Sequence, residues 1–243
     1  MADAIPRYAV YFAPRQGSAH DAFGSRWLGR DARSGSLLPQ PKSPVLGAAR
    51  LAGLTAAARR YGLHATLKPP FRLISPEALP QLDCRLHALA AAQSAFSFRV
   101  AVGSLGDFLA WRPVDQHDRI AAIAAACVTE LDDLRSLPSV EEIERRRAGG
   151  LSAQQEALLL RWGYPYLFDE YRFHITLTDR LTGADAARVR ACLESSCRGF
   201  IEEPLVFDAL ALFVEEDAAD GFRHIRSYGF DGSVWSFPED GAP

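Results

Sequence analysis

The sequence has few cysteines. Its four cysteines, Cys84, Cys127, Cys192 and Cys197, contain no CxxC spacing, and no histidine lies near them at a ligand interval. We therefore expect buried, reduced thiols in a cytoplasmic protein, with no metal and no cofactor.

Long apolar runs and long basic runs are also absent. The longest apolar stretch, Ile120–Val128, is too short to span a bilayer, and the first residues, MADAIPRYAV, lack the pattern of a signal peptide. The net charge of −3 and the lack of a basic stretch argue against long nucleic acids as ligands, because phosphate backbones require many clustered cations. A small phosphorylated sugar or nucleotide needs only a few cations. We therefore expect a small ligand and no membrane.

Several well-known catalytic motifs are missing as well. The chain has no G-x-S-x-G elbow, no Walker A loop and no Rossmann glycine pattern. The chemistry must therefore come from another arrangement of residues.

Helix and strand patterns alternate along the chain and indicate an α+β protein. Strand patterns cover residues 7–14, 63–73, 96–103, 108–114, 173–181, 205–214 and 222–230. Helix patterns separate most of them, whereas 96–103 and 108–114 form a hairpin and the last two strands follow one another. We expect helices from Ser43, with Pro44 in its first position, to Gly62; from Ser75 to Ala92; from His117 to Arg135; and from Thr182 to Gly199. Residues 137–166 carry two capping boxes separated by Gly149-Gly150, which predicts an inserted helical hairpin.

The order strand, helix, strand, strand occurs twice, first from His64 and again from His174. This repeat predicts two pseudo-symmetric α/β lobes around a central cleft, in a single domain over residues 1–243. Lobe one would cover about 1–136, the hairpin about 137–166 and lobe two about 167–243.

Both copies begin with the same short motif, His64-Ala65-Thr66 and His174-Ile175-Thr176. Because side chains alternate along a strand, each histidine should share a face with its threonine, and the residue between them should point into the core. Two such strands facing one another predict a cleft with two imidazoles and two hydroxyls.

Paired imidazoles suit acid–base chemistry at a phosphate. One can deprotonate a water while the other protonates the departing oxygen, and the threonine hydroxyls can donate to the phosphoryl oxygens. We therefore expect a metal-independent hydrolase that opens a cyclic phosphodiester, with His64, Thr66, His174 and Thr176 as catalytic residues. Two alternatives stay open: a phosphodiesterase for RNA or nucleotide 2′,3′-cyclic phosphates, and a non-catalytic module that binds a cyclic phosphate.

Further residues near the motifs are candidates for substrate binding. Lys68 would share the face of Thr66 on a regular strand, and Tyr8 and Tyr11 lie on the first strand. Arg72 and Arg172 flank the two motifs, and Arg7 is a further candidate for a second anion site. The run Arg145-Arg146-Arg147, with glutamates beside it, is more typical of a solvated helix face.

With both motifs in view, the chain resembles the two-histidine (2H) phosphoesterase superfamily, including its LigT-like RNA phosphodiesterases. Members have two lobes that each contribute one His-x-Thr or His-x-Ser motif, so the resemblance assigns the same roles to the two motifs found here. Long stretches are similar to one bacterial branch named for phosphonate metabolism, among them YGLHATLKPPFRL, SLPSVEEIERRRAGGLS and FDEYRFHITLTDRL. That branch is associated with carbon–phosphorus lyase genes, which implies 5-phosphoribosyl 1,2-cyclic phosphate as the substrate.

Overall fold

The strand that carries His64 lies at the edge of a five-stranded antiparallel sheet. In a computed structural model, which describes residues 5–43 and 45–237, its strand order is β10-β9-β8-β1-β2. The strands are β1 (Arg7–Phe12), β2 (Ala65–Phe71), β8 (Ala209–Glu215), β9 (Arg223–Gly229) and β10 (Val234–Ser236). The edge position explains how β2 contains Pro69 and Pro70, since proline cannot donate a hydrogen bond to a neighbouring strand.

The second motif lies in a different sheet. A three-stranded antiparallel sheet has the order β4-β5-β6, with β4 (Val100–Leu105), β5 (Phe108–Pro113) and the short β6 (Ile175–Thr176). A separate ladder joins β3 (Phe96–Phe98) to β7 (Leu205–Phe207). The α+β class predicted from the sequence is confirmed, and all of its strand pairs are antiparallel in the described residues.

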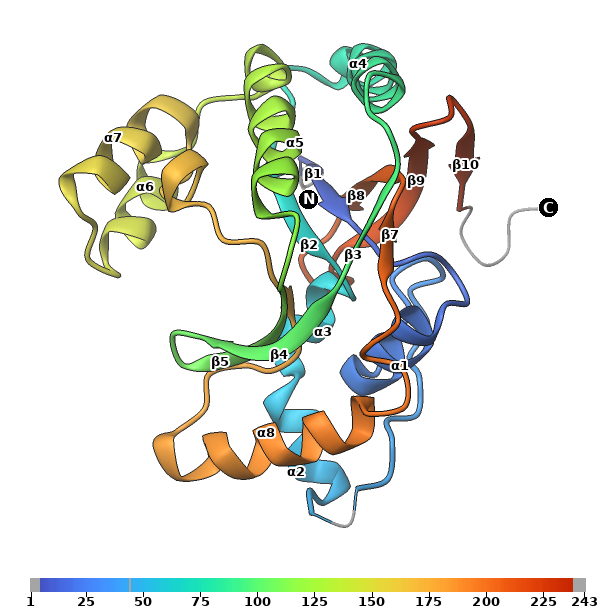
Figure 1. Cartoon of the computed structure of the whole chain (residues 1–243). Helices are drawn as coiled ribbons and strands as arrows, with labels where there is room; N and C mark the ends of the chain where they lie inside the picture. The colour runs from blue at the N-terminus through green and yellow to red at the C-terminus, as the bar shows by residue number, and fades with distance from the viewer. Residues whose placement is uncertain (1–4, 44, 238–243) are drawn as a thin grey trace.

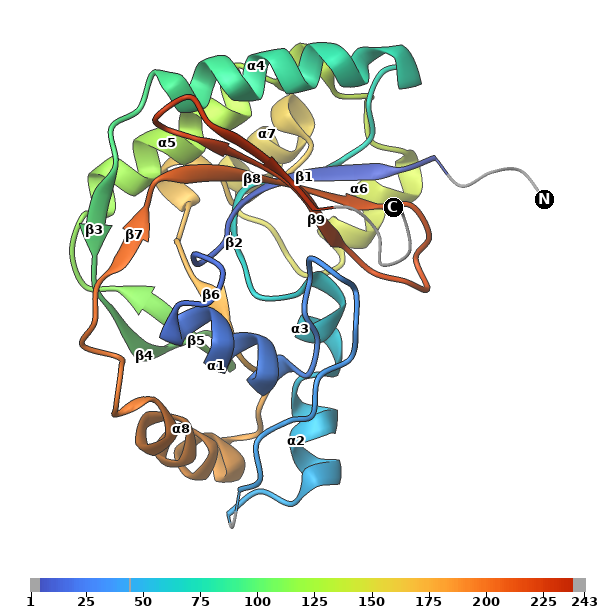
Figure 2. The same cartoon turned by 90° about the vertical axis from the view of Figure 1, so that its right-hand side faces the viewer.

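The strands do not pair as they would in two lobes that follow one another along the chain. β8 and β9, from the end of the chain, join the sheet of the first motif, whereas β4 and β5, from its first half, join the sheet of the second. Figures 1 and 2 show the chain crossing between these sheets more than once. The repeated order of elements is present, but its strands are exchanged, because β1 offers a pairing edge to β8 and β5 offers one to β6.

Helices cover both sheets. α4 (Leu79–Ala91) and α5 (His117–Thr129) pack on the five-stranded sheet, and α8 (Gly183–Cys197) packs on β4 and β5 (Figure 2). α1 (Ala19–Leu28) begins at a Ser18 cap. Short 3₁₀ turns lie at Pro76–Ala78, Asp132–Leu134 and Phe168–Glu170.

The inserted hairpin is formed as predicted. α6 (Val140–Arg147) and α7 (Ala153–Trp162) each begin with a complete capping box, at Ser139 and at Ser152. In Figure 1 the hairpin stands to one side of the sheets, beside the end of α5. None of the α6 side chains is buried, so local capping and a few polar contacts determine its position.

Two expected elements have different limits, and one cysteine differs from the expected burial. The helix expected from Ser43 begins instead at Ala48 and divides at Thr55 into α2 (Ala48–Leu54) and α3 (Ala56–Tyr61); Pro44 lies outside the described residues. The strand expected over 173–181 pairs over only two residues. Of the cysteines, Cys84 is exposed, whereas the other three are buried and all four are free.

Gly221 fixes the start of β9 against the end of α3. Its φ is +73°, and a Cβ there would lie 2.4 Å from the carbonyl oxygen of Arg60. That carbonyl accepts the Phe222 amide at 2.8 Å. The close approach therefore leaves no room for a side chain.

We expect Gly221→Ala to destabilise the fold more than Gly232→Ala. Both glycines have positive φ, which costs about 1–2 kcal/mol for alanine. A methyl group would meet backbone only at Gly221, where overpacking adds roughly 1–3 kcal/mol to the loss of stability. Urea denaturation of the two variants measures the difference, and equal loss of unfolding free energy would contradict the proposed steric constraint.

Candidate functional site

The first motif presents its polar side chains to a cleft and its apolar ones to the core. On β2, Ala65 and Leu67 are buried, whereas His64 and Thr66 line the cleft. The second motif repeats this arrangement: Ile175 and Leu177 are fully buried. His174, Thr176 and Thr178 line the same cleft.

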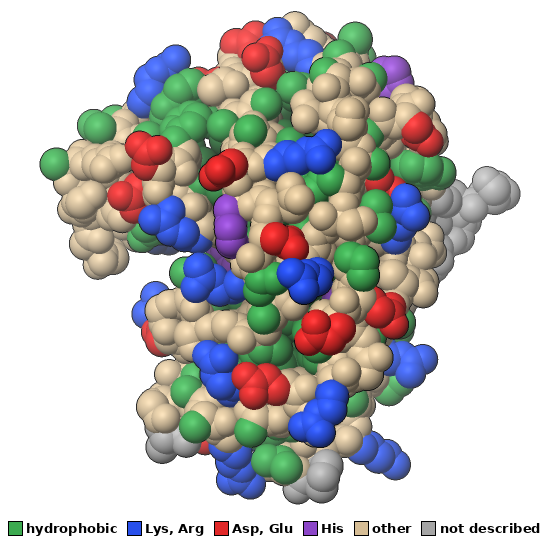
Figure 3. Space-filling view, viewed as in Figure 1, with side chains coloured by type: hydrophobic (Ala, Val, Ile, Leu, Met, Phe, Trp, Pro, Cys, Tyr) green, Lys and Arg blue, Asp and Glu red, His purple; other side chains and the backbone are tan. Residues whose placement is uncertain are grey.

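The cleft that brings both motifs together has a volume of about 920 Å³, within the range of small-molecule sites. It is hollowed between the helical hairpin and the sheets, where the surface shows histidine beside Lys and Arg side chains (Figure 3). Besides the motif residues its walls include Arg7, Tyr11, Arg60, Tyr61, Phe108, Arg145, Arg146, Tyr164, Asp179 and Arg180.

Main-chain carbonyls orient both imidazoles. Nδ1 of His64 lies 3.0 Å from the oxygen of Gly62, and Nδ1 of His174 lies 2.6 Å from the oxygen of Arg172. Because a carbonyl only accepts hydrogen bonds, each Nδ1 carries the proton and donates it. Each neutral ring then keeps an unprotonated Nε2 that accepts hydrogen bonds or protons.

Burial keeps both rings neutral. It lowers the pKa of His64 to about 4, an effect that the Gly62 carbonyl opposes and the nearby His174 reinforces. Burial likewise lowers the pKa of His174, against the opposing influence of the Arg172 carbonyl. At neutral pH the cleft therefore holds two hydrogen-bond acceptors and no imidazolium.

Aromatic contacts fix the His64 ring further. The Tyr11 ring lies 4.0 Å from it between centroids, and Tyr61 lies at 5.9 Å. Tyr11 is buried, so its ring is a fixed support for the imidazole. The prediction that Tyr11 lines the site agrees with its place in the cleft wall.

A single buried carboxylate organises two of the cleft arginines. Glu215 accepts from Nε of Arg7 at 2.7 Å through one oxygen and from Nε of Arg60 at 2.9 Å through the other. One negative charge between two guanidinium groups leaves an excess positive charge at the cleft.

Acidic groups add little negative charge elsewhere in the wall. Asp179 accepts from the amides of Ala57 and Ala58, where it caps α3. Five arginines face the cleft against this one carboxylate in its lining. The electrostatics therefore favour an anionic ligand.

Lys68 points away from the cleft, contrary to the prediction. Tyr11 pairs with Thr66, and its neighbour Val10 pairs with Lys68, so Leu67 is the extra residue of a β-bulge. Neighbouring residues on β1 point to opposite faces, and Lys68 consequently faces the core with Val10. Its ammonium donates to the Val128 carbonyl at 3.2 Å, and burial lowers its pKa to about 8.

The other predicted substrate-binding residues lie outside the cleft wall. Arg72 forms an ion pair with Glu142 at 2.7 Å, and Arg172 is exposed and donates to the carbonyls of Asp169 and Tyr171. Tyr8 packs against the core on the face of β1 opposite Tyr11. Proximity in sequence was a poor guide for these three residues.

Arg145 and Arg146 lie on a solvated helix face, as expected, but they also line the cleft wall, which the sequence did not indicate. Only the third member of the run, Arg147, forms the expected pairs, with Glu144 and Glu156. Arg60, Tyr61, Tyr164 and Arg180 were also missed, since no local motif marks them. The one available signal was the hairpin itself, inserted between the two motifs with a basic helix end.

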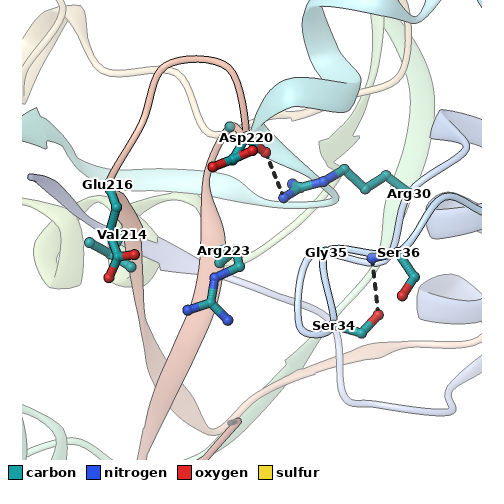
Figure 4. Close-up of a pocket in the computed structure, with 9 residues that line it drawn as sticks. Arg30, Ser34, Gly35, Ser36, Val214, Glu216, Asp220 and Arg223 are labelled. Atoms are coloured by element: carbon teal, nitrogen blue, oxygen red, sulfur yellow. Dashed lines mark hydrogen bonds between the residues drawn. The ribbon is translucent and has the colours of Figure 1, made fainter. Parts of the chain in front are cut away.

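A second pocket, of about 400 Å³, lacks the features of the cleft. Figure 4 shows Arg30 and Arg223 in it together with Glu216 and Asp220, so cations and carboxylates balance. Arg30 donates to the main-chain oxygens of Phe222 at 2.6 Å and of Asp220 at 3.1 Å. It thereby holds the loop before β9. The paired histidines distinguish the cleft as the candidate site.

Neither a metal-binding cluster nor a transmembrane helix occurs in the described part of the chain. Over 5–43 and 45–237, no three His, Cys, Asp or Glu side chains are grouped so that they could hold a metal ion. Within the same residues, no helix has the length and apolar character of a transmembrane span.

Comparison with known families and proteins gives one family match and two curated relatives. Residues 66–223 match the family described as "Protein of unknown function (DUF1045)". The chain is 40% identical over 235 residues to a ribose 1,5-bisphosphate phosphokinase PhnN of Janthinobacterium sp. (strain Marseille), covering 95% of this chain and 52% of the relative. It is 38% identical to the protein of that name from Laribacter hongkongensis (strain HLHK9), covering 90% of this chain and 51% of the relative. The chain thus spans about half the length of these relatives.

Among solved structures, Kluyveromyces marxianus Usb1 aligns with 98% of this chain and 100% of its own, at a TM-score of 0.40 and 10% identity. A similarity at that level is too low to support a fold assignment.

The names of the curated relatives contradict the predicted activity. A phosphokinase is a transferase that moves a phosphoryl group, whereas we expected a hydrolase that opens a cyclic phosphodiester. The predicted cyclic phosphodiesterase activity, on 5-phosphoribosyl 1,2-cyclic phosphate or on nucleotide 2′,3′-cyclic phosphates, is therefore wrong on this comparison. Residue chemistry alone failed here because two imidazoles and two hydroxyls suit binding and several kinds of phosphoryl chemistry equally well.

We expect the His64 ring to titrate near pH 4 in the free protein, because burial disfavours its charged form. A bound phosphate dianion should raise that midpoint, because a nearby negative charge stabilises the imidazolium. NMR of the ring nitrogens, assigned with a His64→Gln variant, measures both values. A midpoint at or above 6.5 in the free protein would contradict the neutral, buried ring.

Proposed function

We propose that this chain, which belongs to the DUF1045 family, binds a phosphorylated ribose in the cleft between His64 and His174. The observation that carries the proposal is the pairing of two neutral imidazoles with a surplus of arginine in one cavity. The curated relatives are named for a kinase of ribose 1,5-bisphosphate, which is a ligand of the matching chemistry.

The hydrogen-bond acceptors of the cleft suit the ribose of such a ligand, and its donors suit the phosphate. Ribose hydroxyls donate hydrogen bonds, and the unprotonated Nε2 atoms of the two histidines accept them. Phosphoryl oxygens accept, and the hydroxyls of Thr66 and Thr176 and the guanidinium groups of the wall donate. An unphosphorylated sugar would leave the arginine charges without a counter-ion.

We assign the sugar phosphate, and not the nucleotide, to this chain. A kinase needs a site for its phosphoryl donor, and the sequence has no Walker A loop to cradle one. The relatives are about twice as long as their match to this chain. In such proteins the nucleotide would be bound by the remaining half, and this chain would hold the phosphorylated sugar.

Three finer assignments belong to the same proposal. Two His-x-Thr motifs in one cleft support kinship with the two-histidine superfamily at the level of site architecture. The shared designation of the relatives, PhnN, supports a place in phosphonate metabolism. The free cysteines are compatible with the expected cytoplasmic location.

We expect wild-type protein to bind ribose 5-phosphate and not ribose in isothermal titration calorimetry. His64→Ala and His174→Ala should each weaken binding roughly 2–10-fold, because each removes one hydrogen-bond acceptor. Arg26→Gln is the control, since Arg26 is exposed on α1 and lies outside the cleft wall. Equal affinity for ribose and ribose 5-phosphate, or unchanged affinity in both histidine variants, would overturn the proposal.

A further inference from the structure

A small side chamber opens beside the cleft. It has a volume of about 50 Å³ and shares four wall residues with the cleft: Arg7, Pro70, Arg145 and Arg146. Beyond these its wall includes Arg72 and Arg135. The chamber is too small for a sugar, but it has room for a few water molecules. The two cavities thus meet at a boundary formed largely by arginine.

The arginines deeper in the chamber are already neutralised. Arg72 is paired with Glu142 at 2.7 Å, and Arg135 is paired with Asp132 at 3.0 Å. Arg7, at the boundary, shares the Glu215 carboxylate with Arg60. Arg72 and Arg135 therefore bring little free charge to a ligand, whereas Arg7 and Arg60 together keep one excess positive charge.

Arg145 and Arg146 differ from them. Among residues 5–43 and 45–237, neither has a carboxylate within ion-pair distance. The guanidinium of Arg146 lies over the Tyr164 ring, 4.5 Å from its centroid. A guanidinium over an aromatic ring does not use its N–H donors in that contact, so they remain able to bind phosphate oxygens.

The rest of α6 positions this pair. Glu142 accepts the Ser139 amide in the capping box and also pairs with Arg72 on the body of the protein, so one side chain both starts the helix and anchors it. Arg147 ties the helix end to Glu156 on α7. With both ends held, the last turn of α6 faces the boundary between the two cavities.

We propose that Arg145 and Arg146 form a second phosphate subsite, so that the cleft selects a sugar bisphosphate over a monophosphate. Two phosphates on one ribose repel each other, and each needs its own cations. The arginines held by Glu215, beside the two motifs, serve one phosphate, and the arginine pair of the hairpin serves the other. This inference rests on the proposed function and assigns the inserted hairpin a role in ligand selection.

The test compares the affinities of ribose 1,5-bisphosphate and ribose 5-phosphate by isothermal titration calorimetry. Wild-type protein should prefer the bisphosphate by at least about tenfold, the value of one or more charge-assisted hydrogen bonds. In the double variant Arg145→Gln/Arg146→Gln the ratio of the two affinities should fall toward one. Arg26→Gln should keep the wild-type ratio, and circular dichroism confirms that the variants are folded.

The outcomes separate the two proposals. A wild-type protein that binds both sugars equally, or a double variant that keeps the full preference, overturns the second subsite and leaves the proposed function standing. A wild-type protein that binds neither sugar overturns the proposed function and the subsite with it.

Discussion

The alternation of side chains along two short strands is the constraint on which the site depends. Ala65, Leu67, Ile175 and Leu177 are buried to at least 99%, and burying each large apolar side chain is worth about 1.5–3 kcal/mol. That burial fixes the rotation of each strand. The histidine and threonine between them consequently point to the opposite face, into the cleft. Exchange of strands between the two halves of the chain then brings the two faces together.

The cleft combines neutral and charged groups in a way that suits a sugar phosphate. Carbonyl partners at Nδ1 hold both imidazoles in one tautomer, and burial lowers their pKa values. The buried Glu215 costs desolvation energy, which its two arginine partners offset. Without either arginine, that carboxylate would keep an uncompensated charge. The positive character of the cleft is therefore coupled to the stability of the fold around β8.

Local signals were sufficient for features that depend on a few neighbouring residues. The two motifs predicted which side chains share a face, and the boxes at Ser139 and Ser152 predicted where both hairpin helices begin. The Pro69-Pro70 pair is compatible with the edge position of β2, because proline cannot donate a hydrogen bond to a neighbouring strand. In each case the physical cause lies within four residues, so the sequence is enough.

Features that depend on partners distant in sequence were not predictable. The bulge at Leu67 that turns Lys68 into the core is defined by pairing with β1. Arg145 and Arg146 lie at the cleft because the ion pair between Glu142 and Arg72, which are 70 residues apart, holds α6 in place. The activity also escaped prediction, because the same donors and acceptors serve a hydrolase and a protein that binds a sugar phosphate.

A crystal structure of the protein with ribose 5-phosphate would show whether the ligand lies in the cleft. We predict the sugar between the imidazoles of His64 and His174, with its phosphate on arginines of the cleft wall. Density for the ligand in the pocket of Arg30 and Arg223, or no density in the cleft at saturating concentration, would contradict binding of the sugar phosphate between His64 and His174.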